Sequence, residues 1–128
     1  MSRVVHFEIH VDNPARAAQF YTSVFGWNIQ KWGDLDYWLI TTGTPDQVGI
    51  NGGMFPRQGA APSEPNPISA FVCSIDVDAI DDAMNRVMGA GGTVVVPKRA
   101  LVGVGWSAYC KDTEGNIFGL SQTDPQAR

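Results

Sequence analysis

The chain has 128 residues, of which 44% are hydrophobic, and this is enough for one domain with a real core. Its formal net charge is −4, with 9 basic and 13 acidic residues and no basic stripe, which argues against nucleic-acid binding. No apolar run approaches the roughly 18 residues of a membrane span. The first ten residues lack the apolar core of a signal peptide, so we expect a cytoplasmic protein. Cys73 and Cys110 stand alone inside apolar runs, which predicts two buried free thiols.

Residues 4–11 alternate between apolar and polar side chains, which predicts a half-buried strand. The apolar side of this strand consists of Val5, Phe7, Ile9 and Val11. The polar side consists of His6, Glu8 and His10, and it holds both histidines of the chain. This segment, HFEIH, is the most chemically loaded part of the sequence.

A helix is predicted to follow this strand. The sequence Asp-Asn-Pro at 12–14 supplies a capping oxygen and a proline suited to the first helical position, and Gly26 is placed to end the helix. The side chains expected on the packed face recur at helical spacing: Ala17, Phe20, Tyr21 and Val24. Three further strands are expected at 27–32, 37–42 and 48–55, separated by turn residues.

The same pattern begins again after residues 57–67, a segment with three prolines that predicts a linker. A strand is expected at 68–75, and Asp76-Val77-Asp78 is expected to open a helix that closes at 89–92. The helix face consists of Ile80, Ala83, Met84 and Val87. Three more strands are expected at 93–96, 104–110 and 116–121.

The chain is therefore predicted to be an α+β domain of two tandem βαβββ units. Unit one covers 1–56, the linker 57–67, unit two 68–122 and a tail 123–128. Asp12 and Asp76, 64 residues apart, occupy equivalent helix entries, and Gly53 and Gly119, 66 residues apart, occupy equivalent last strands. Two such units can pair and enclose a ligand cavity between their sheets.

The segment HFEIHVDNPARAAQFYTSVFGW and the ending KDTEGNIFGL resemble the vicinal oxygen chelate superfamily. This superfamily includes glyoxalase I, bleomycin- and fosfomycin-resistance proteins and extradiol dioxygenases. The resemblance covers essentially the whole chain. It rests on the helix entry at 12–14, the aromatic residues before Trp27 and the terminal pattern Asp112-x-Glu114-Gly115-Asn116. It implies that the two units form a paired, partly open mixed-sheet barrel with a cavity.

Metal-dependent members of the superfamily take their ligands from four equivalent places. The resemblance puts these places at His6, Gly53, Ala70 and Gly119, and only His6 can bind a metal. Relatives that bind metal carry a Glu where this chain has Gly119, and a Pro where it has Thr113. We therefore expect no cofactor, with a divalent metal at His6 as the alternative.

Strand geometry gives the same expectation for HFEIH. Four residues along a strand separate the Cα atoms of His6 and His10 by about 13 Å, so the two rings cannot share one ion. His6 with Glu8 would supply only two ligands, which are too few for a tight site. The resemblance implies that the helix packs on the apolar face, which leaves the polar face to line the cavity; the alternative is a solvated outer face.

Further ligand-binding candidates come from other strands. Ser107 and Tyr109 alternate on one face of their strand, opposite the more apolar face formed by Trp106, Ala108 and Cys110. Fosfomycin-resistance relatives carry a similarly spaced Ser and Tyr that contact ligand; alternatively, Tyr109 is a wall residue bonded to backbone. Asn51 has the phase of Gly53 and can point the same way. Gly52, Gly53 and Gly119 fit either a bulky ligand or a close backbone contact.

Two functions of different class follow. The preferred hypothesis is a metal-independent protein that binds a small organic molecule through His6, Glu8, His10, Asn51, Ser107 and Tyr109. The alternative is a glyoxalase-like lyase or isomerase acting on a carbonyl compound, with Glu8 or His6 as base and Tyr109 stabilising an enolate. The resemblance also implies a homodimer, in which the two units pair within one chain or swap between chains.

Overall fold

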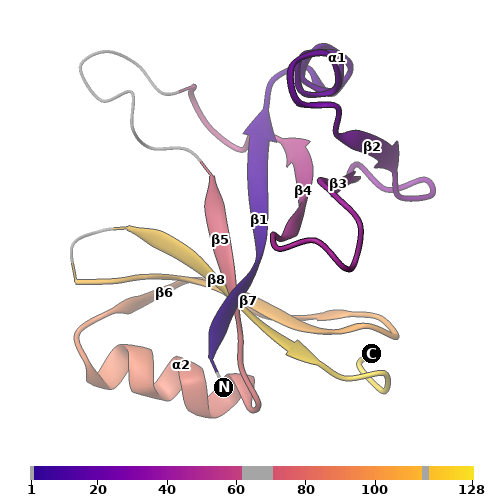
Figure 1. The fold of residues 1–128 in the computed structure, drawn as a ribbon. Coiled ribbons are helices and arrows are strands. Elements are labelled where there is room, and N and C mark those ends of the chain that lie inside the picture. Colours follow the sequence, from indigo (N-terminus) through magenta and orange to yellow (C-terminus); the bar gives the residue numbers. More distant parts are fainter. Residues whose placement is uncertain (1, 62–70, 114–115) are drawn as a thin grey trace. The chain divides into compact units, whose positions relative to one another are not determined.

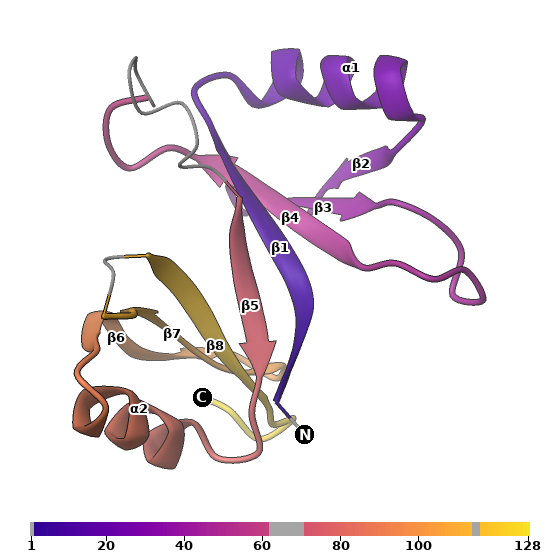
Figure 2. The same ribbon diagram turned by 60° about the vertical axis from the view of Figure 1, so that its left-hand side comes forward.

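The computed structural model describes residues 2–61, 71–113 and 116–128. The chain divides into two compact units. The N-terminal unit comprises residues 6–71, and the C-terminal unit comprises residues 2–5 and 72–128, in each case as far as they are described. In both units one helix packs against a sheet (Figure 1 and Figure 2).

The N-terminal unit has the predicted order of one strand, one helix and three strands. Its elements are β1 (Arg3–Val11), α1 (Pro14–Phe25), β2 (Asn28–Lys31), β3 (Trp38–Thr41) and β4 (Asn51–Pro56). The strand order in this unit is β2-β3-β4-β1, in which β1 runs parallel to β4 and the other neighbours are antiparallel. The helix α1 carries the chain from β1 to β2, at the opposite edge of this sheet. The antiparallel strands β2, β3 and β4 then lead back to β1, and β4 lies parallel to it, so the sheet is mixed.

The ends of α1 follow the predicted capping chemistry. The side chain of Asn13 accepts a hydrogen bond from the backbone N–H of Arg16 at 3.0 Å, and Pro14 is the first helical residue. Gly26 adopts the left-handed conformation with φ 73° and donates its N–H to the carbonyl of Thr22. The predicted extent of this helix is therefore confirmed.

The packed face of α1 differs from the prediction. Phe20 and Val24 are both 55% exposed, and the residues of α1 that pack on the core of the unit are Ala17, Ala18 and Tyr21. The helical periodicity was predicted correctly, but the face of α1 that packs on the sheet is shifted by about one residue, towards smaller side chains. Small residues allow the helix to lie close to the sheet, and this leaves the larger ones outside.

The core of the N-terminal unit is formed by the apolar face of β1, as predicted. Its buried members are Phe7, Ile9, Val11, Ile40 and Met54. Val5, expected on the same face, is 46% exposed and is not part of this core. The other face of β1 carries His6, Glu8 and His10, and it holds the candidate site.

The C-terminal unit repeats the order of elements. It contains β5 (Val72–Asp76), α2 (Ile80–Gly89), β6 (Thr93–Leu101), β7 (Gly105–Lys111) and β8 (Ile117–Thr123). The strand order is β5-β8-β7-β6, with β5 parallel to β8. The second βαβββ unit is confirmed. Residues 62–70, which include most of the predicted linker and the start of the predicted strand 68–75, lie outside the described residues.

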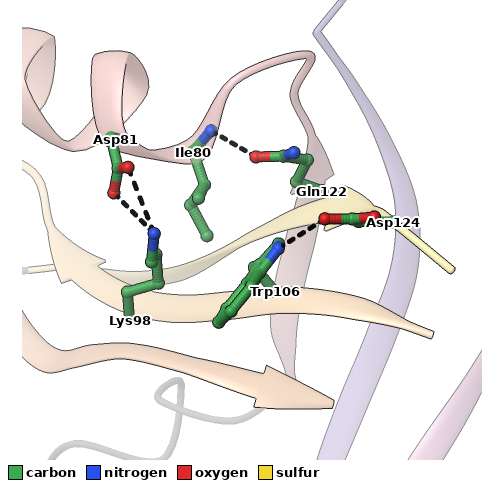
Figure 3. A network of polar contacts seen from close by, with 6 residues as sticks. All are labelled: Ile80, Asp81, Lys98, Trp106, Gln122 and Asp124. Carbon is green, nitrogen blue, oxygen red and sulfur yellow. Dashed lines mark hydrogen bonds and ion pairs between the residues drawn. The ribbon is translucent and has the colours of Figure 1, made fainter. Parts of the chain in front are cut away.

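The start of α2 is built differently from the prediction. Asp76 ends β5, the N-cap position falls on Ala79, and no side chain of the N-cap residue bonds to the helix. The side chain of Gln122, on β8, instead accepts a hydrogen bond from the backbone N–H of Ile80 at 2.9 Å (Figure 3). A residue distant in sequence therefore satisfies one of the free N–H groups of the helix.

The predicted tail, 123–128, is attached to the C-terminal unit. Thr123 is the last residue of β8, and Asp124 accepts a hydrogen bond from the indole N–H of Trp106 at 2.9 Å (Figure 3). Ala127 is 2% exposed, and its carbonyl accepts from the backbone N–H of Gly103 at 3.0 Å. This segment is part of the folded unit.

The two cysteines are both free, as predicted, but their environments differ. Cys110 is buried within the core of the C-terminal unit, whereas Cys73 is exposed, which contradicts the prediction. Cys73 alternates with the buried Val72 and Ser74 along β5, so it takes the outer face.

The α+β class and the two βαβββ units are thus shown. The pairing of the units into a partly open barrel with a cavity concerns their relative placement, and it stays a prediction. Neither described helix has the length and apolar character needed to cross a membrane.

Candidate functional site

The candidate site lies on the polar face of β1, where the parallel register sets each residue beside one of β4. His6 pairs with Asn51, Glu8 with Gly53 and His10 with Phe55. Glu8 is only 7% exposed, although its face is polar, whereas the side chain of His6 is 32% exposed. A carboxylate buried to this degree needs hydrogen-bond donors close by.

Tyr37, just before β3, supplies such a donor. Its hydroxyl lies 2.9 Å from Nε2 of His6 and donates a hydrogen bond to Oε2 of Glu8 at 3.1 Å. Nε2 of His6 is 3.9 Å from the same Glu8 oxygen. The tyrosine hydroxyl therefore bridges the imidazole and the carboxylate. We call His6, Tyr37 and Glu8 the bridged triad.

The sequence places Tyr37 at the start of the strand expected at 37–42, but no local pattern marks it as a site residue. The glycine opposite Glu8 is what makes room for it. A Cβ added at Gly53 would overlap the Tyr37 hydroxyl and ring, whereas one added at Gly52 would meet the backbone and ring of Phe7. Gly52 thus makes the close backbone contact that was one of the two alternatives, whereas Gly53 gives room to a side chain of the protein, which neither alternative included.

His10 lies further along the same face. Its ring centroid is 4.3 Å from that of Phe55, and its Nε2 is buried without a hydrogen-bond partner among the described residues. Burial lowers the pKa of His10, nearby Glu8 raises it and Arg57 lowers it further. Burial also lowers the pKa of His6 below its usual value, with Glu8 partly offsetting this effect. Both imidazoles therefore favour the neutral form at neutral pH.

Aromatic rings line this face of the N-terminal unit. Trp32 meets Tyr37 edge-on at 5.9 Å, Tyr37 stacks against Phe55 at 5.9 Å, and Phe55 contacts His10. A polar cluster beside aromatic walls is the usual composition of a small-molecule site.

The predicted candidate Asn51 has a structural contact at the edge of this face. Its side-chain oxygen accepts hydrogen bonds from the backbone N–H of Thr42 at 2.9 Å and from the Thr42 hydroxyl at 3.3 Å. Asn51 also belongs to the lining of a cavity of about 300 Å³ formed by residues of the loop between β3 and β4. Its side chain therefore fixes this loop.

The other two predicted candidates, Ser107 and Tyr109, lie on β7 of the C-terminal unit. Tyr109 pairs with Gly119 and Ser107 with Ser121 across to β8, so they share one face. The opposite face, with Ala108 and Cys110, packs under α2, which confirms the predicted phase of this strand. A cavity that would join these residues to His6 stays a prediction.

The residues at the family's metal positions do not fit a metal centre. Nε2 of His6 already contacts Tyr37, Gly53 has no side chain, and its space is filled by the Tyr37 ring. Gly119 likewise offers no donor, and Ala70 lies outside the described residues. Within the described ranges no group of three or more His, Cys, Asp or Glu side chains could hold an ion. No step of chemistry through a metal can be derived from these residues.

Comparison with known sequences gives a match in the first third of the chain. Residues 3–43 match the family model described as bleomycin resistance protein-like N-terminal. A search of curated proteins found no match.

Solved structures share the fold over nearly the whole chain. A glyoxalase/bleomycin resistance protein/dioxygenase superfamily member from Vibrio splendidus 12B01 is 16% identical with a TM-score of 0.64, and the match covers 95% of this chain and 99% of that one. The methylmalonyl-CoA epimerase from Mycobacterium tuberculosis is 14% identical with a TM-score of 0.62, covering 95% and 88%. The Mn(II)-bound glyoxalase from Novosphingobium aromaticivorans is 20% identical with a TM-score of 0.59, covering 99% of this chain and 41% of the longer one.

These findings confirm the resemblance inferred from the sequence: the chain has the fold of the vicinal oxygen chelate superfamily, and residues 3–43 match its bleomycin resistance protein-like N-terminal family.

Proposed function

We propose that this protein binds a small organic molecule on the polar face of β1 without a catalytic metal. The observation that carries the proposal is the bridged triad, in which Tyr37 links Nε2 of His6 to the buried Glu8 carboxylate. The polar groups are satisfied by one another, so that they need no ion. The part-exposed imidazole of His6 remains available to a ligand.

The ligand contacts would come from the polar face and the rings beside it. His6, Glu8 and His10 supply the polar groups on β1, and Phe55 and Trp32 supply apolar walls. Asn51, Ser107 and Tyr109 complete the proposed ligand-binding set. Such a mixture suits a molecule with an apolar body and a few hydrogen-bonding groups.

The test combines metal analysis with a binding titration. Protein purified without chelators is expected to contain no stoichiometric divalent ion, and a stoichiometric ion would sink the proposal. Bleomycin is the first probe, because residues 3–43 match a bleomycin resistance protein-like family. Calorimetric titration of the metal-free protein is expected to show binding that His6→Gln weakens at least about tenfold, or about 1.4 kcal/mol.

Tyr21→Phe is the matched control for this titration. Tyr21 lies on α1, on the other side of the sheet, where it stacks against Trp27. Removing its hydroxyl should leave the affinity unchanged. Equal weakening by the Tyr21 and His6 variants would show that the loss comes from general instability and not from the site.

A glyoxalase-like lyase or isomerase is the second candidate, and the bridged triad also favours it. A neutral imidazole coupled through a hydroxyl to a carboxylate can accept a proton from a carbon next to a carbonyl, with the positive charge stabilised by Glu8. The test is turnover of methylglyoxal with glutathione by the metal-free protein, and again after addition of Mn²⁺. Turnover lost in His6→Ala supports this candidate, and no turnover under either condition excludes it for this substrate.

We also propose a homodimer. Three large apolar side chains on α1, Phe20, Val24 and Phe25, are between 55% and 59% exposed, and α1 has no buried residue. Exposed apolar groups of this kind favour association. Light scattering after size-exclusion chromatography should give twice the chain mass of 13.8 kDa, and a monomer at all concentrations would contradict the proposal.

A further inference from the structure

The direction of the hydrogen bonds within the bridged triad follows from proton counting. The Tyr37 hydroxyl carries one proton, and a carboxylate can only accept. If that proton pointed to His6, the lone pairs of the Tyr37 oxygen and of Glu8 Oε2 would face each other at 3.1 Å. Glu8 is 7% exposed, so water would relieve this repulsion poorly. The proton therefore points to Glu8.

His6 must then donate to the Tyr37 oxygen. The 2.9 Å contact between Nε2 and that oxygen is a hydrogen bond only if Nε2 carries a proton. In a neutral imidazole the other ring nitrogen, Nδ1, is consequently an acceptor.

The acceptor nitrogen is accessible. Among the described residues, the one buried side-chain nitrogen or oxygen without a hydrogen-bond partner is Nε2 of His10. Nδ1 of His6 also has no hydrogen-bond partner in the described ranges, but it is not buried. It is therefore open to solvent.

We propose that Tyr37 is a positioning residue that holds His6 as the Nε2–H tautomer and so presents Nδ1 as an acceptor to a ligand that brings a hydrogen-bond donor. This inference deepens the proposed function and rests on it for the role of the ligand. The ligand class is a molecule with a hydroxyl or N–H group placed at His6. A ligand oxyanion at this position would be repelled by the lone pair of Nδ1 of His6 and by the nearby Glu8 carboxylate.

Gly53 is part of this arrangement. Because a Cβ at position 53 would overlap the Tyr37 hydroxyl, only glycine allows the tyrosine to reach between His6 and Glu8. Tyr37→Phe and Gly53→Ala should therefore have the same effect on the His6 tautomer, although one removes an oxygen and the other adds a methyl group.

The experiment is a long-range proton–nitrogen NMR spectrum of the ¹⁵N-labelled, metal-free protein at mildly alkaline pH. The chain has two histidines, so a His10→Gln variant assigns both rings. In the wild-type protein Nε2 of His6 should be protonated and Nδ1 should not. In Tyr37→Phe and in Gly53→Ala the ring should shift towards a mixture of tautomers, whereas Tyr21→Phe should leave it unchanged.

Two results would overturn the tautomer assignment. One is a proton on Nδ1 in the wild-type protein, and the other is an unchanged tautomer in Tyr37→Phe. Circular dichroism of each variant shows that it is folded, so a lost fold cannot imitate the effect.

The ligand class is tested with a matched pair of probes, phenol and anisole, which share a ring and differ in the donor. Phenol should shift the Nδ1 signal of the wild-type protein, and anisole should not. An equal response to both, or none to either, would overturn the assignment of a donor. The bleomycin titration tests the proposed function independently, because Nε2 of His6 can carry the proton even in a protein that does not bind bleomycin.

Discussion

Replacement of Gly53 by alanine should destabilise the protein through a side chain that is far away in sequence. The three atoms nearest to an added Cβ all belong to Tyr37. The tyrosine would have to leave the bridged triad, and its hydroxyl would lose both hydrogen bonds. The hydrogen bond to the imidazole is worth about 1 kcal/mol and the charge-assisted one to Glu8 about 1.5–3 kcal/mol.

An opposing effect reduces this loss. Alanine restricts the unfolded chain more than glycine does, which stabilises the folded state by about 0.4–1 kcal/mol. The net destabilisation expected for Gly53→Ala is therefore about 1.5–3.6 kcal/mol. In a chain of this length it lowers the melting temperature by about 3–5 °C per kcal/mol.

Urea unfolding followed by circular dichroism measures the change, and a double-mutant cycle assigns it to the tyrosine. In a Tyr37→Ala background no ring stands in the way, so Gly53→Ala should no longer destabilise the protein and should stabilise it by about 0.4–1 kcal/mol. Gly59→Ala is the matched control in the same unit, because a Cβ there meets nothing within 4 Å. Equal destabilisation with and without the Tyr37 ring would refute the reasoning, as would an unaffected single variant.

Three further predictions concern the rest of the molecule. Burial lowers the pKa of His10, so the unfolded chain binds a proton at this residue first as the pH falls. The contribution of the neutral His10 to the free energy of unfolding should be fully present above about pH 6.5 and decrease below it. His10→Gln should flatten this decrease, as measured by urea unfolding at several pH values. Gln122→Ala should cost about 1 kcal/mol by removing the acceptor at the start of α2, while Gln126→Ala should change the free energy of unfolding by less than about 0.5 kcal/mol. A thiol reagent should label Cys73 at once and Cys110 only after unfolding, and equal rates would contradict the assigned burial.

The order of elements could be predicted from the sequence because local chemistry determines it. Alternation along residues 4–11 produced β1, and Asn13, Pro14 and Gly26 produced the two ends of α1. Both signals act between neighbours in the chain, so no tertiary information was needed. The helix face was less accurate, because a periodicity of 3.6 residues does not say whether large or small side chains meet the sheet.

The start of α2 shows the same limit more clearly. The aspartates at 76 and 78 have the composition of a helix cap, yet the residue that accepts from the first helical N–H is Gln122, 42 residues further along the chain. No local pattern could reveal this partner. The structure here uses a tertiary contact where the sequence suggested a local one.

The candidate site divides along the same line. The polar face of β1 could be predicted, because it follows from a period of two. Tyr37 could not, because its role depends on β3 and β4 bringing it beside Gly53. The sequence shows that position 53 has no side chain, but it does not show that Tyr37 fills the space.

The glycine and the tyrosine are best understood as one structural feature. A side chain at position 53 would stand beside Glu8 across the parallel pair of β1 and β4, and its absence alone would leave a buried carboxylate poorly solvated. Tyr37 donates a hydrogen bond to this carboxylate, and the same oxygen contacts Nε2 of His6. His6, Tyr37 and Glu8 are thereby hydrogen-bonded to one another, whereas Nε2 of His10, on the same face of β1, is buried without a partner among the described residues. For the proposed ligand-binding role, this means that the bridged triad is organised before a ligand arrives, which favours binding because little ordering is left to be done.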